Sequence, residues 1–221
     1  MKIAAKAVRA GILSLSLLSI ITGCKTSSPE KSGADLFNGK DFSGWTFCMK
    51  SNSAPEKTWS VANGLIHCTG QPSGYARTEQ IYGDYRLTVV WRFVKVAPHA
   101  DNTGILVQMQ LPDKVWPECV ECQGQYQRQG DFWLLSGVNA NDHPADSKKA
   151  VRVPQIGPTN ENPAGEWNTN QIVCRGNIIE LAVNGRKMNQ LAGCNLSSGF
   201  IGIQSEGGEI EVRKLFLEPL N

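Results

Sequence analysis

The sequence predicts an all-β domain, built as a sandwich or a barrel of short strands. Apolar and polar residues alternate with a period of two in segments such as 85–93, where Leu87 and Val89 share one face. Turn-forming pairs such as Asn184-Gly185 separate these segments. Helical periodicity is hard to find along the chain. Many short strands with regular turns favour a sandwich or a barrel over alternating strands and helices.

The first 23 residues have the pattern of a secretory signal. A positively charged start precedes the apolar stretch 11–21, which is too short to span a bilayer comfortably. Small residues and Cys24 follow, and this ending resembles the bacterial lipobox, in which the cysteine is lipidated and becomes the new N-terminus. Segment 1–23 is therefore interpreted as a lipoprotein signal peptide, with a plain signal peptide as the alternative.

Residues 24–34 combine the lipidated Cys24 with small polar residues, which predict a flexible tether. Attached acyl chains hold a protein to a membrane, and more than one is needed for a stable anchor. Lys25 stands where Asp would favour retention in the inner membrane of a Gram-negative cell. We therefore expect a location in the cell envelope, anchored by lipid to the outer membrane, and leave open which side it faces.

Residues 35–221 are enough for one domain with a sizeable core. The formal net charge is +2 and no basic cluster stands out, which argues against nucleic acid as a partner. Six cysteines lie beyond Cys24, so disulfides are permitted in an exported protein. Cys119-x-x-Cys122 has no second pair and no histidine at ligand spacing, so we expect structural or buried thiols rather than a zinc site.

Further strands are predicted from the same alternation and turn signals, at 105–110, 178–183, 200–204 and 210–217. Segment 178–183 is apolar at nearly every position, so we expect burial on both of its faces. Long loops are expected at about 49–57, 94–102, 111–117 and 136–165. The last loop is long for a compact domain, and such loops are often functional.

Four segments carry a resemblance to one family. They are 36–45 (LFNGKDFSGW), 118–123 (ECVECQ), 165–168 (GEWN) and 202–210 (GIQSEGGEI). On these residues the chain resembles the 3-keto-disaccharide hydrolases over about residues 35–219. The resemblance implies a single domain with a concanavalin-like jelly-roll β-sandwich, in which a concave sheet carries the ligand.

The resemblance places Glu121 and Gln123 in a Glu-x-Gln element of this concave sheet. Residues two apart on a strand share a face, so both would point at the ligand. Such a carboxylate and amide can bind sugar hydroxyls, or the carboxylate can move a proton, although an ordinary exposed strand face has the same composition. Glu206 is the second candidate carboxylate, because relatives carry His or Glu at this position. Turn chemistry around Gly207 is its alternative explanation.

His143 is a further candidate for proton transfer, as the counterpart of Glu121 in place of Glu206. The remaining candidates would bind substrate, and they are Arg77, Arg92, Asn102, Trp133 and Trp167. Arg92 lies opposite the apolar face of its strand, so we expect it on the concave surface or in a salt bridge across the sheet. An aromatic face such as that of Trp133 stacks well on a sugar ring, and Trp116 and Trp167 compete for this role. Trp167 is also a candidate core residue.

The resemblance implies cleavage of glycosides that are already oxidised at C3. A ketone at C3 acidifies the hydrogen on C2, so a base can remove it, the enolate can expel the C1 substituent, and water can then add. No cofactor is predicted, and a divalent metal is left open. The alternatives are a glycan-binding surface lipoprotein without catalysis, an ordinary glycoside hydrolase with two carboxylates, and a structural protein of the cell envelope.

Overall fold

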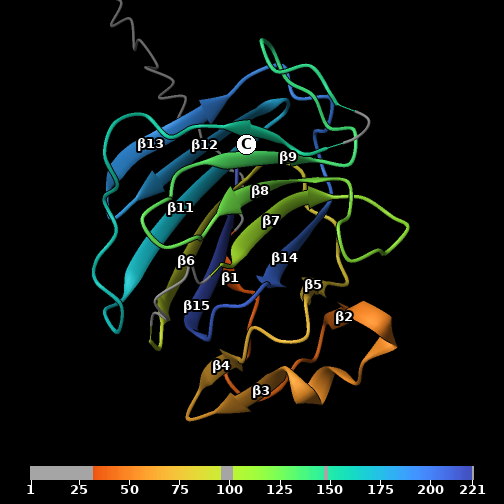
Figure 1. The fold of residues 1–221 in the computed structure, drawn as a ribbon, viewed down its shortest axis with the longest axis vertical. Coiled ribbons are helices and arrows are strands. Elements are labelled where there is room, and N and C mark those ends of the chain that lie inside the picture. The colour runs from red at the N-terminus through yellow and green to blue at the C-terminus, as the bar shows by residue number, and fades with distance from the viewer. Residues whose placement is uncertain (1–31, 96–101, 147–148, 221) are drawn as a thin grey trace, which may run out of the picture. The chain divides into compact units, whose positions relative to one another are not determined.

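The computed structural model describes residues 32–95, 102–146 and 149–220, which form two packed antiparallel β-sheets (Figure 1). The expected signal segment and Cys24 lie outside the described residues. Ala34, at the end of the expected tether, already pairs with Leu217. In the described part of the chain, no helix is long and apolar enough to cross a membrane.

Sheet A has eight strands in the order β13-β12-β11-β6-β15-β4-β3, with β1 paired to β15. Its strands are β1 (Ala34–Asp35), β3 (Trp59–Ala62), β4 (Leu65–Cys68), β6 (Tyr85–Phe93), β11 (Asn168–Arg175), β12 (Ile178–Val183), β13 (Arg186–Leu191) and β15 (Ile210–Pro219). The long strand β15 lies between β6 and β4, so the end of the chain completes the middle of this sheet.

Sheet B has seven strands in the order β10-β9-β8-β7-β14-β5-β2. They are β2 (Trp45–Met49), β5 (Gly74–Thr78), β7 (Gly104–Met109), β8 (Cys119–Gln123), β9 (Phe132–Leu135), β10 (Val151–Val153) and β14 (Phe200–Ser205). Two short 3-10 helices, η1 (Lys50–Asn52) and η2 (Pro55–Lys57), follow β2. Strand β14 lies between β7 and β5, so a late segment of the chain stands beside two early ones.

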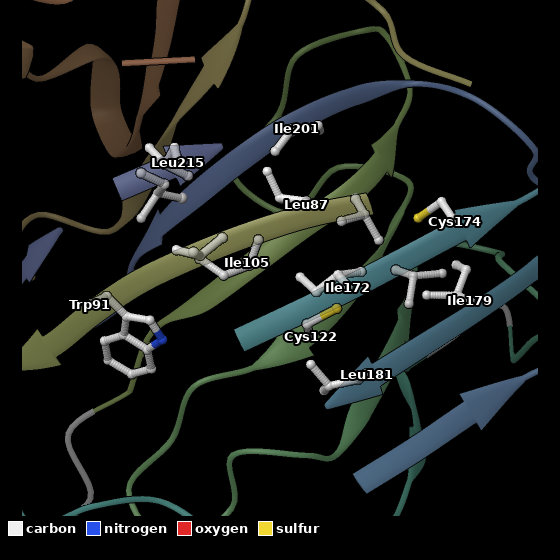
Figure 2. Close-up of a cluster of buried hydrophobic side chains, with 14 of the residues drawn as sticks. Leu87, Trp91, Ile105, Cys122, Ile172, Cys174, Ile179, Leu181, Ile201 and Leu215 are labelled. Atoms are coloured by element: carbon white, nitrogen blue, oxygen red, sulfur yellow. The ribbon is translucent and has the colours of Figure 1, made fainter. Parts of the chain in front are cut away.

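The main core fills the space between the two sheets. Figure 2 shows Leu87, Ile172 and Leu181 of sheet A facing Ile105 and Cys122 of sheet B. These side chains are almost fully buried, which makes their removal from water the main favourable contribution to folding. Because the inner face of each strand is apolar, the register of the sheets is fixed and the outer faces are left for polar groups.

The alternation in 85–93 is confirmed, because β6 has these bounds and its odd-numbered residues lie in the core. The turns at Asn184-Gly185 and at Gly176 are also confirmed, with positive φ angles at all three residues. Burial of 178–183 on both faces is wrong. Ile178 is 37% exposed, and only the inner residues of β12 are buried, because the outer face of sheet A is open to solvent here.

The expected loop 136–165 contains a short strand, β10, which pairs with β9 at the edge of sheet B. The expectation of buried thiols is confirmed for five of the six cysteines of the described residues. All six cysteines from Cys48 to Cys194 are free, and all except the half-buried Cys48 are buried. Cys119 and Cys122 point to opposite faces of β8, with Cys122 in the main core and Cys119 in a second apolar cluster on the other face.

Candidate functional site

A cavity of about 490 Å³ lies on the face of sheet B that points away from the main core. Its volume is within the range of roughly 300–1,000 Å³ that is typical of small-molecule sites. The residues that line it come from three strands of the sheet and from loops that cover them. They are Asn102, Trp116, Glu121, Gln123, Gln125, Trp133, Leu135, Ser136, Asp146, Lys149, Ala150, Gln204 and Glu206.

The register of sheet B explains why these side chains meet. Leu106 of β7, Glu121 of β8 and Trp133 of β9 are directly opposite one another across the three strands. Directly opposed residues of antiparallel strands have Cβ atoms about 5 Å apart and share a face. Glu121 therefore lies between an apolar neighbour, Leu106, and the indole of Trp133.

Among the acids that line the cavity, Glu121 has the pKa that is raised most. Its side chain is only 4% exposed, and its Oε1 atom has no hydrogen-bond partner among the described residues. Burial, followed by the charge of Glu206, raises the pKa of Glu121 to about 8. Removing a carboxylate from water favours its neutral form, and a second negative charge nearby adds to this effect. At neutral pH Glu121 therefore holds a proton that it can donate.

Glu206 follows β14 and is held by an amide on the neighbouring strand end. Asn102 Nδ2 donates to Glu206 Oε2 over 2.7 Å, and the two residues also form an isolated backbone bridge. Gly207 adopts a φ of 103°, which lets the chain turn immediately after the carboxylate. Burial raises the pKa of Glu206, and a hydrogen bond from the Gln204 side chain acts in the opposite direction. Glu206 therefore ionises less readily than a free glutamate, but amide donors stabilise its charged form.

Gln123 presents an amide to the same cavity from β8. Its Oε1 atom accepts a hydrogen bond from the Gln125 backbone N–H at 2.8 Å, which orients the side chain. With the oxygen engaged, the amide nitrogen is the group that remains to donate to a ligand. Thr103 Oγ1 donates to the Gln204 carbonyl at 2.7 Å and so ties the start of β7 to β14 beneath the site.

Five of the candidates from sequence are brought together by the fold, since Glu121, Glu206, Asn102, Gln123 and Trp133 all line the cavity. They come from segments that are far apart in the chain. Their meeting follows from the strand order, in which β14, β7, β8 and β9 are neighbours (Figure 1).

Arg77 lies on the same face of sheet B but does not line the cavity. Its Nε and Nη2 atoms both donate to the Asp113 carboxylate at 2.7 Å, and the Tyr75 hydroxyl donates to the same group. The guanidinium also lies over the ring of Phe200, 4.3 Å from its centroid. Arg77 therefore anchors the loop that carries Asp113 to the sheet.

Arg92 and Trp167 lie on the outer face of sheet A, so the expectation of Arg92 on the ligand-bearing surface is not met. Arg92 Nη2 and Glu211 Oε2 form an ion pair at 2.6 Å, and Arg92 Nη1 donates to the Gly165 carbonyl. The guanidinium groups of Arg92 and Arg213 each lie 4.4 Å from the centroid of Trp167. The salt bridge across the sheet, which was the alternative for Arg92, is the arrangement found.

His143 lies in the loop before β10, where its backbone pairs with Ala140, and it is not among the residues that line the cavity. Among the described residues, no group of three or more His, Cys, Asp or Glu side chains is placed to hold a metal ion. The carboxylates of the cavity come from Glu121, Glu206 and Asp146.

Sequence reasoning did not assign several lining residues, including Gln125, Gln204 and Lys149. Gln204 is part of the Gln-Ser-Glu-Gly-Gly run, and its spacing of two from Glu206 was the signal that could have placed it in the site. Lys149 lies in the long loop 136–165, in which no periodicity indicates a face.

Several solved structures with a similar fold have names that refer to carbohydrate hydrolysis or carbohydrate binding. A proposed glycosyl hydrolase from Parabacteroides distasonis is 20% identical, with a TM-score of 0.61 over 86% of this chain and 94% of that one. A β-glucanase from Bacillus licheniformis is 13% identical, with a TM-score of 0.55 over 85% and 96%. A carbohydrate-binding module from Bacillus subtilis is 9% identical, with a TM-score of 0.53 over 79% and 95%. These similarities confirm the concanavalin-like jelly-roll fold.

Comparison with curated protein sequences gives no significant match. The profile of the 3-keto-alpha-glucoside-1,2-lyase-like domain matches residues 33–218, which include every residue of the cavity. The chain therefore belongs to the 3-keto-alpha-glucoside-1,2-lyase-like family.

Proposed function

We propose that this protein cleaves glycosides that carry a ketone at C3, by removal of the C2 proton, loss of the C1 substituent and addition of water. The observation that supports it most is Glu121, a buried carboxyl group with a pKa of about 8 in the wall of the cavity. A second carboxyl group, Glu206, shares the cavity and interacts with it. Two acids whose environments separate their pKa values are typical of acid–base sites.

We infer the roles of the two carboxyl groups from their environments. Glu121 has no hydrogen-bond donor at Oε1 and keeps its proton at neutral pH, so it is the general acid. Glu206 receives hydrogen bonds from amide groups, which favour the carboxylate, so it is the general base. In the first step Glu206 takes the proton from C2, and the electrons of the C–H bond form the enolate of the C3 ketone.

In the second step the enolate electrons form a double bond between C1 and C2 and break the bond from C1 to the leaving oxygen. Glu121 gives its proton to that oxygen and becomes a carboxylate. Water then adds its oxygen to C1, Glu121 takes a proton from the water, and Glu206 returns its proton to C2. Both carboxyl groups regain their first state, and the net reaction is hydrolysis.

Charge on the C3 oxygen develops in the first step and needs donors that are already oriented. The amide of Gln123 is held by Gln125 and lines the cavity, so it is the donor we assign to this oxygen. Arg77 and Arg92 are the basic side chains that the sequence suggested for substrate binding. Both guanidinium groups are instead engaged by carboxylates of the protein.

Hydrogen exchange at C2 separates the two roles. The chain without its signal segment, residues 25–221, is incubated in D₂O with a 3-keto-glucoside and with the unoxidised parent. The native protein should release the aglycone from the keto compound only. Glu121→Gln should still exchange the C2 hydrogen for deuterium but release little aglycone, whereas Glu206→Gln should lose both.

The alternatives give different results in the same assay. Release from the unoxidised parent would indicate ordinary two-carboxylate hydrolysis. Saturable binding of a glycan with no exchange and no release would indicate a carbohydrate-binding protein. We also propose, from the sequence of residues 1–34, that the protein is anchored by lipid in the cell envelope, where it would meet glycosides outside the cytoplasm.

A further inference from the structure

The chain enters the folded domain over the outer face of sheet A. A Cβ atom at Gly33 would lie 2.5 Å from the ring of Phe216, so the backbone rests on this ring. Phe216 is opposite Thr88 of β6, whose neighbours Leu87 and Val89 lie in the core. Thr88 and Phe216 therefore belong to the face that points away from the core. Any anchor at the start of the chain is attached on this side of the sandwich.

A bulge in β15 places two positive side chains on the same face. The pairing of β15 with β6 shifts its register between Val212 and Lys214. Arg213 and Lys214 are consecutive and both exposed, whereas Val212 and Leu215 on either side of them lie in the core. In a regular strand, one of two consecutive residues would point into the core. The bulge therefore gives the outer face one more cation than regular alternation allows.

The outer face keeps an excess of positive charge after its ion pairs are counted. Three pairs lie across the strands, Arg92 with Glu211, Lys187 with Glu180 and Arg86 with Glu218. The other charged side chains of the face are Arg175, Arg213, Lys214 and Asp35. Among the described residues, these four form no ion pair with one another or with other groups. The face therefore presents three cations and one acid in addition to its pairs.

This excess is a local feature of the molecule. The whole chain has 22 basic and 20 acidic residues, and three of the basic ones, Lys2, Lys6 and Arg9, lie in the expected signal segment. Beyond that segment acidic residues outnumber basic ones, so the other surfaces together are acidic. The basic face has the sign of charge that anionic lipid headgroups attract.

Two aromatic rings lie among the cations of this face. The Arg213 guanidinium is 4.4 Å from the centroid of Trp167, and Lys214 Nζ is 4.9 Å from the centroid of Phe216. Both rings are half-buried. Basic residues beside Trp and Phe on one face are typical of protein surfaces that lie against a membrane.

We propose that the outer face of sheet A lies against the headgroups of anionic phospholipids in the membrane that holds the lipid anchor. The inference rests on the proposed lipid at Cys24 and is independent of the proposed reaction. Gly33 is nine residues after Cys24, and an extended chain of this length spans at most roughly 30 Å. The tether therefore keeps the domain close to the membrane, where the charge of the headgroups acts on the basic face.

This orientation has a consequence for the cavity. The cavity lies on the outer face of sheet B, and the core separates that face from the outer face of sheet A. With sheet A against the membrane, the cavity opens away from the lipid. The protein would then take its substrate from the aqueous side and not from the membrane.

Lysine footprinting measures which face the membrane covers. Residues 25–221 retain every strand of the sandwich, and an N-terminal histidine tag holds them on vesicles that contain a nickel-chelating lipid, so the test does not require lipidation. The vesicles consist otherwise of phosphatidylcholine, or of equal parts of phosphatidylcholine and phosphatidylglycerol. Mass spectrometry gives the acylation rates of Lys187 and Lys214 on the basic face. The exposed Lys57 and Lys114, which lie outside sheet A, are the internal controls.

Lys187 and Lys214 should be acylated at least about threefold more slowly on the anionic vesicles than on the neutral ones, whereas Lys57 and Lys114 should not change. About 1 M salt should remove the difference, because it shortens the Debye length to about 3 Å. Equal rates at all four lysines would overturn the proposal. Protection that persists on neutral vesicles or at high salt would also overturn it, since the covering group would then not be an anionic headgroup.

A matched pair of charge reversals tests the bulge. Arg213→Glu combined with Lys214→Glu should abolish the protection of Lys187, with a native far-UV circular dichroism spectrum. Lys57→Glu combined with Lys114→Glu changes the total charge equally and should leave the protection intact. Arg175→Glu, at the exposed end of β11, is a second variant of the face and should reduce the protection. Equal effects of the two double variants would show that net charge, and not this face, controls the orientation.

Two further measurements separate the proposal from its alternatives. If alginate protects Lys214 in solution and the anionic vesicles do not, the face binds an anionic glycan and the proposal is wrong. The kcat/KM of the Arg213→Glu, Lys214→Glu protein for a soluble 3-keto-glucoside should equal that of the native protein. A native footprint without cleavage of any keto compound would support this face and count against the reaction alone. Cleavage without a footprint would do the reverse.

Discussion

Gly104 and Glu121 approach each other so closely across β7 and β8 that a side chain on the glycine would displace the acid. A Cβ atom at Gly104 would lie 2.6 Å from Glu121 Oε1 and 2.7 Å from its Cγ. Side-chain atoms do not approach this closely without a shift of one partner. A glycine within a strand often marks such a close approach. The position of the proposed general acid therefore depends on a residue that has no side chain.

Gly104→Ala should lower kcat/KM by roughly 10²-fold, because a displacement of about 1 Å at a catalytic group is enough for such a loss. The variant should also lose some stability, since both Oε1 and Cγ of the buried Glu121 side chain must move. Steady-state kinetics and thermal unfolding measure the two effects. Gly83→Ala is the control, because a Cβ atom there would meet no neighbour within 4 Å. Full activity of Gly104→Ala would show that the observed position of Glu121 is not needed.

The rate should fall at high pH when Glu121 loses its proton. With a pKa of about 8 for this acid, kcat/KM for an alkyl 3-keto-glucoside should decline above about pH 8. A nitrophenyl leaving group departs without a proton, so the decline should be much weaker for the aryl compound. Both compounds should lose activity at low pH, as Glu206 is protonated. The same high-pH decline for both compounds would argue against Glu121 as the acid of the leaving group.

Glu121→Gln should stabilise the protein at neutral pH. Between the ordinary pKa of 4.5 and the folded value of about 8, the unfolded chain ionises Glu121 and the folded chain does not. The free energy of unfolding therefore falls as the pH rises through this range, and a neutral glutamine avoids this loss. Each kcal/mol gained should raise Tm by roughly 2–4 °C for a domain of this size.

Calorimetry at pH 4 and pH 7 distinguishes this effect from better packing. At pH 4 both forms of the chain carry a protonated Glu121, so the gain in Tm from Glu121→Gln should almost vanish. An equal gain at both pH values would mean that the burial of Glu121 does not raise its pKa.

The sequence was sufficient for those strands and turns that depend on local chemistry alone. The alternation in β6 and the pair Asn184-Gly185 predict a strand and a hairpin without reference to the rest of the chain. Glu121 and Gln123 could likewise be placed on one face from their spacing alone. Which sheet a strand joins depends on contacts far along the chain, and periodicity does not report them. For this reason the sequence left Arg92 either on the concave surface or in a salt bridge across the sheet, although its face of β6 was right.

Loop residues of the site were harder to predict for a different reason. Trp116 and Lys149 reach the cavity from segments with no regular period, so neither spacing nor composition indicates where their side chains point. Trp116 was recognised as an aromatic side chain that could stack on a sugar. Its place in the cavity lining depends on the course of its loop, which a hydrogen bond from Ser136 Oγ to the Trp116 carbonyl ties to the end of β9.

Cys24→Ser should abolish lipid attachment. In a Gram-negative host that expresses the full chain, labelled palmitate should be incorporated into the native protein and not into this variant, and the variant should leave the membrane fraction. Cys48→Ser is the control, because Cys48 is a half-buried thiol within the folded domain and should leave labelling intact. Labelling that persists in Cys24→Ser would place the lipid elsewhere or indicate a plain signal peptide.

Trp167→Ala should lower stability and leave catalysis intact. The indole of Trp167 contacts the guanidinium groups of Arg92 and Arg213, and each such contact is worth about 0.5–1 kcal/mol at an exposed site. Together with the lost packing of the ring, the free energy of unfolding should fall by about 1–3 kcal/mol. This loss should lower Tm by several degrees. Because Trp167 lies on the outer face of sheet A, kcat/KM for a 3-keto-disaccharide should stay within about twofold of the native value.

Trp133→Ala provides the contrast, since its ring lines the cavity and its loss should lower kcat/KM. A Trp167→Ala protein with normal Tm and a tenfold loss of kcat/KM would mean that substrate reaches this outer face.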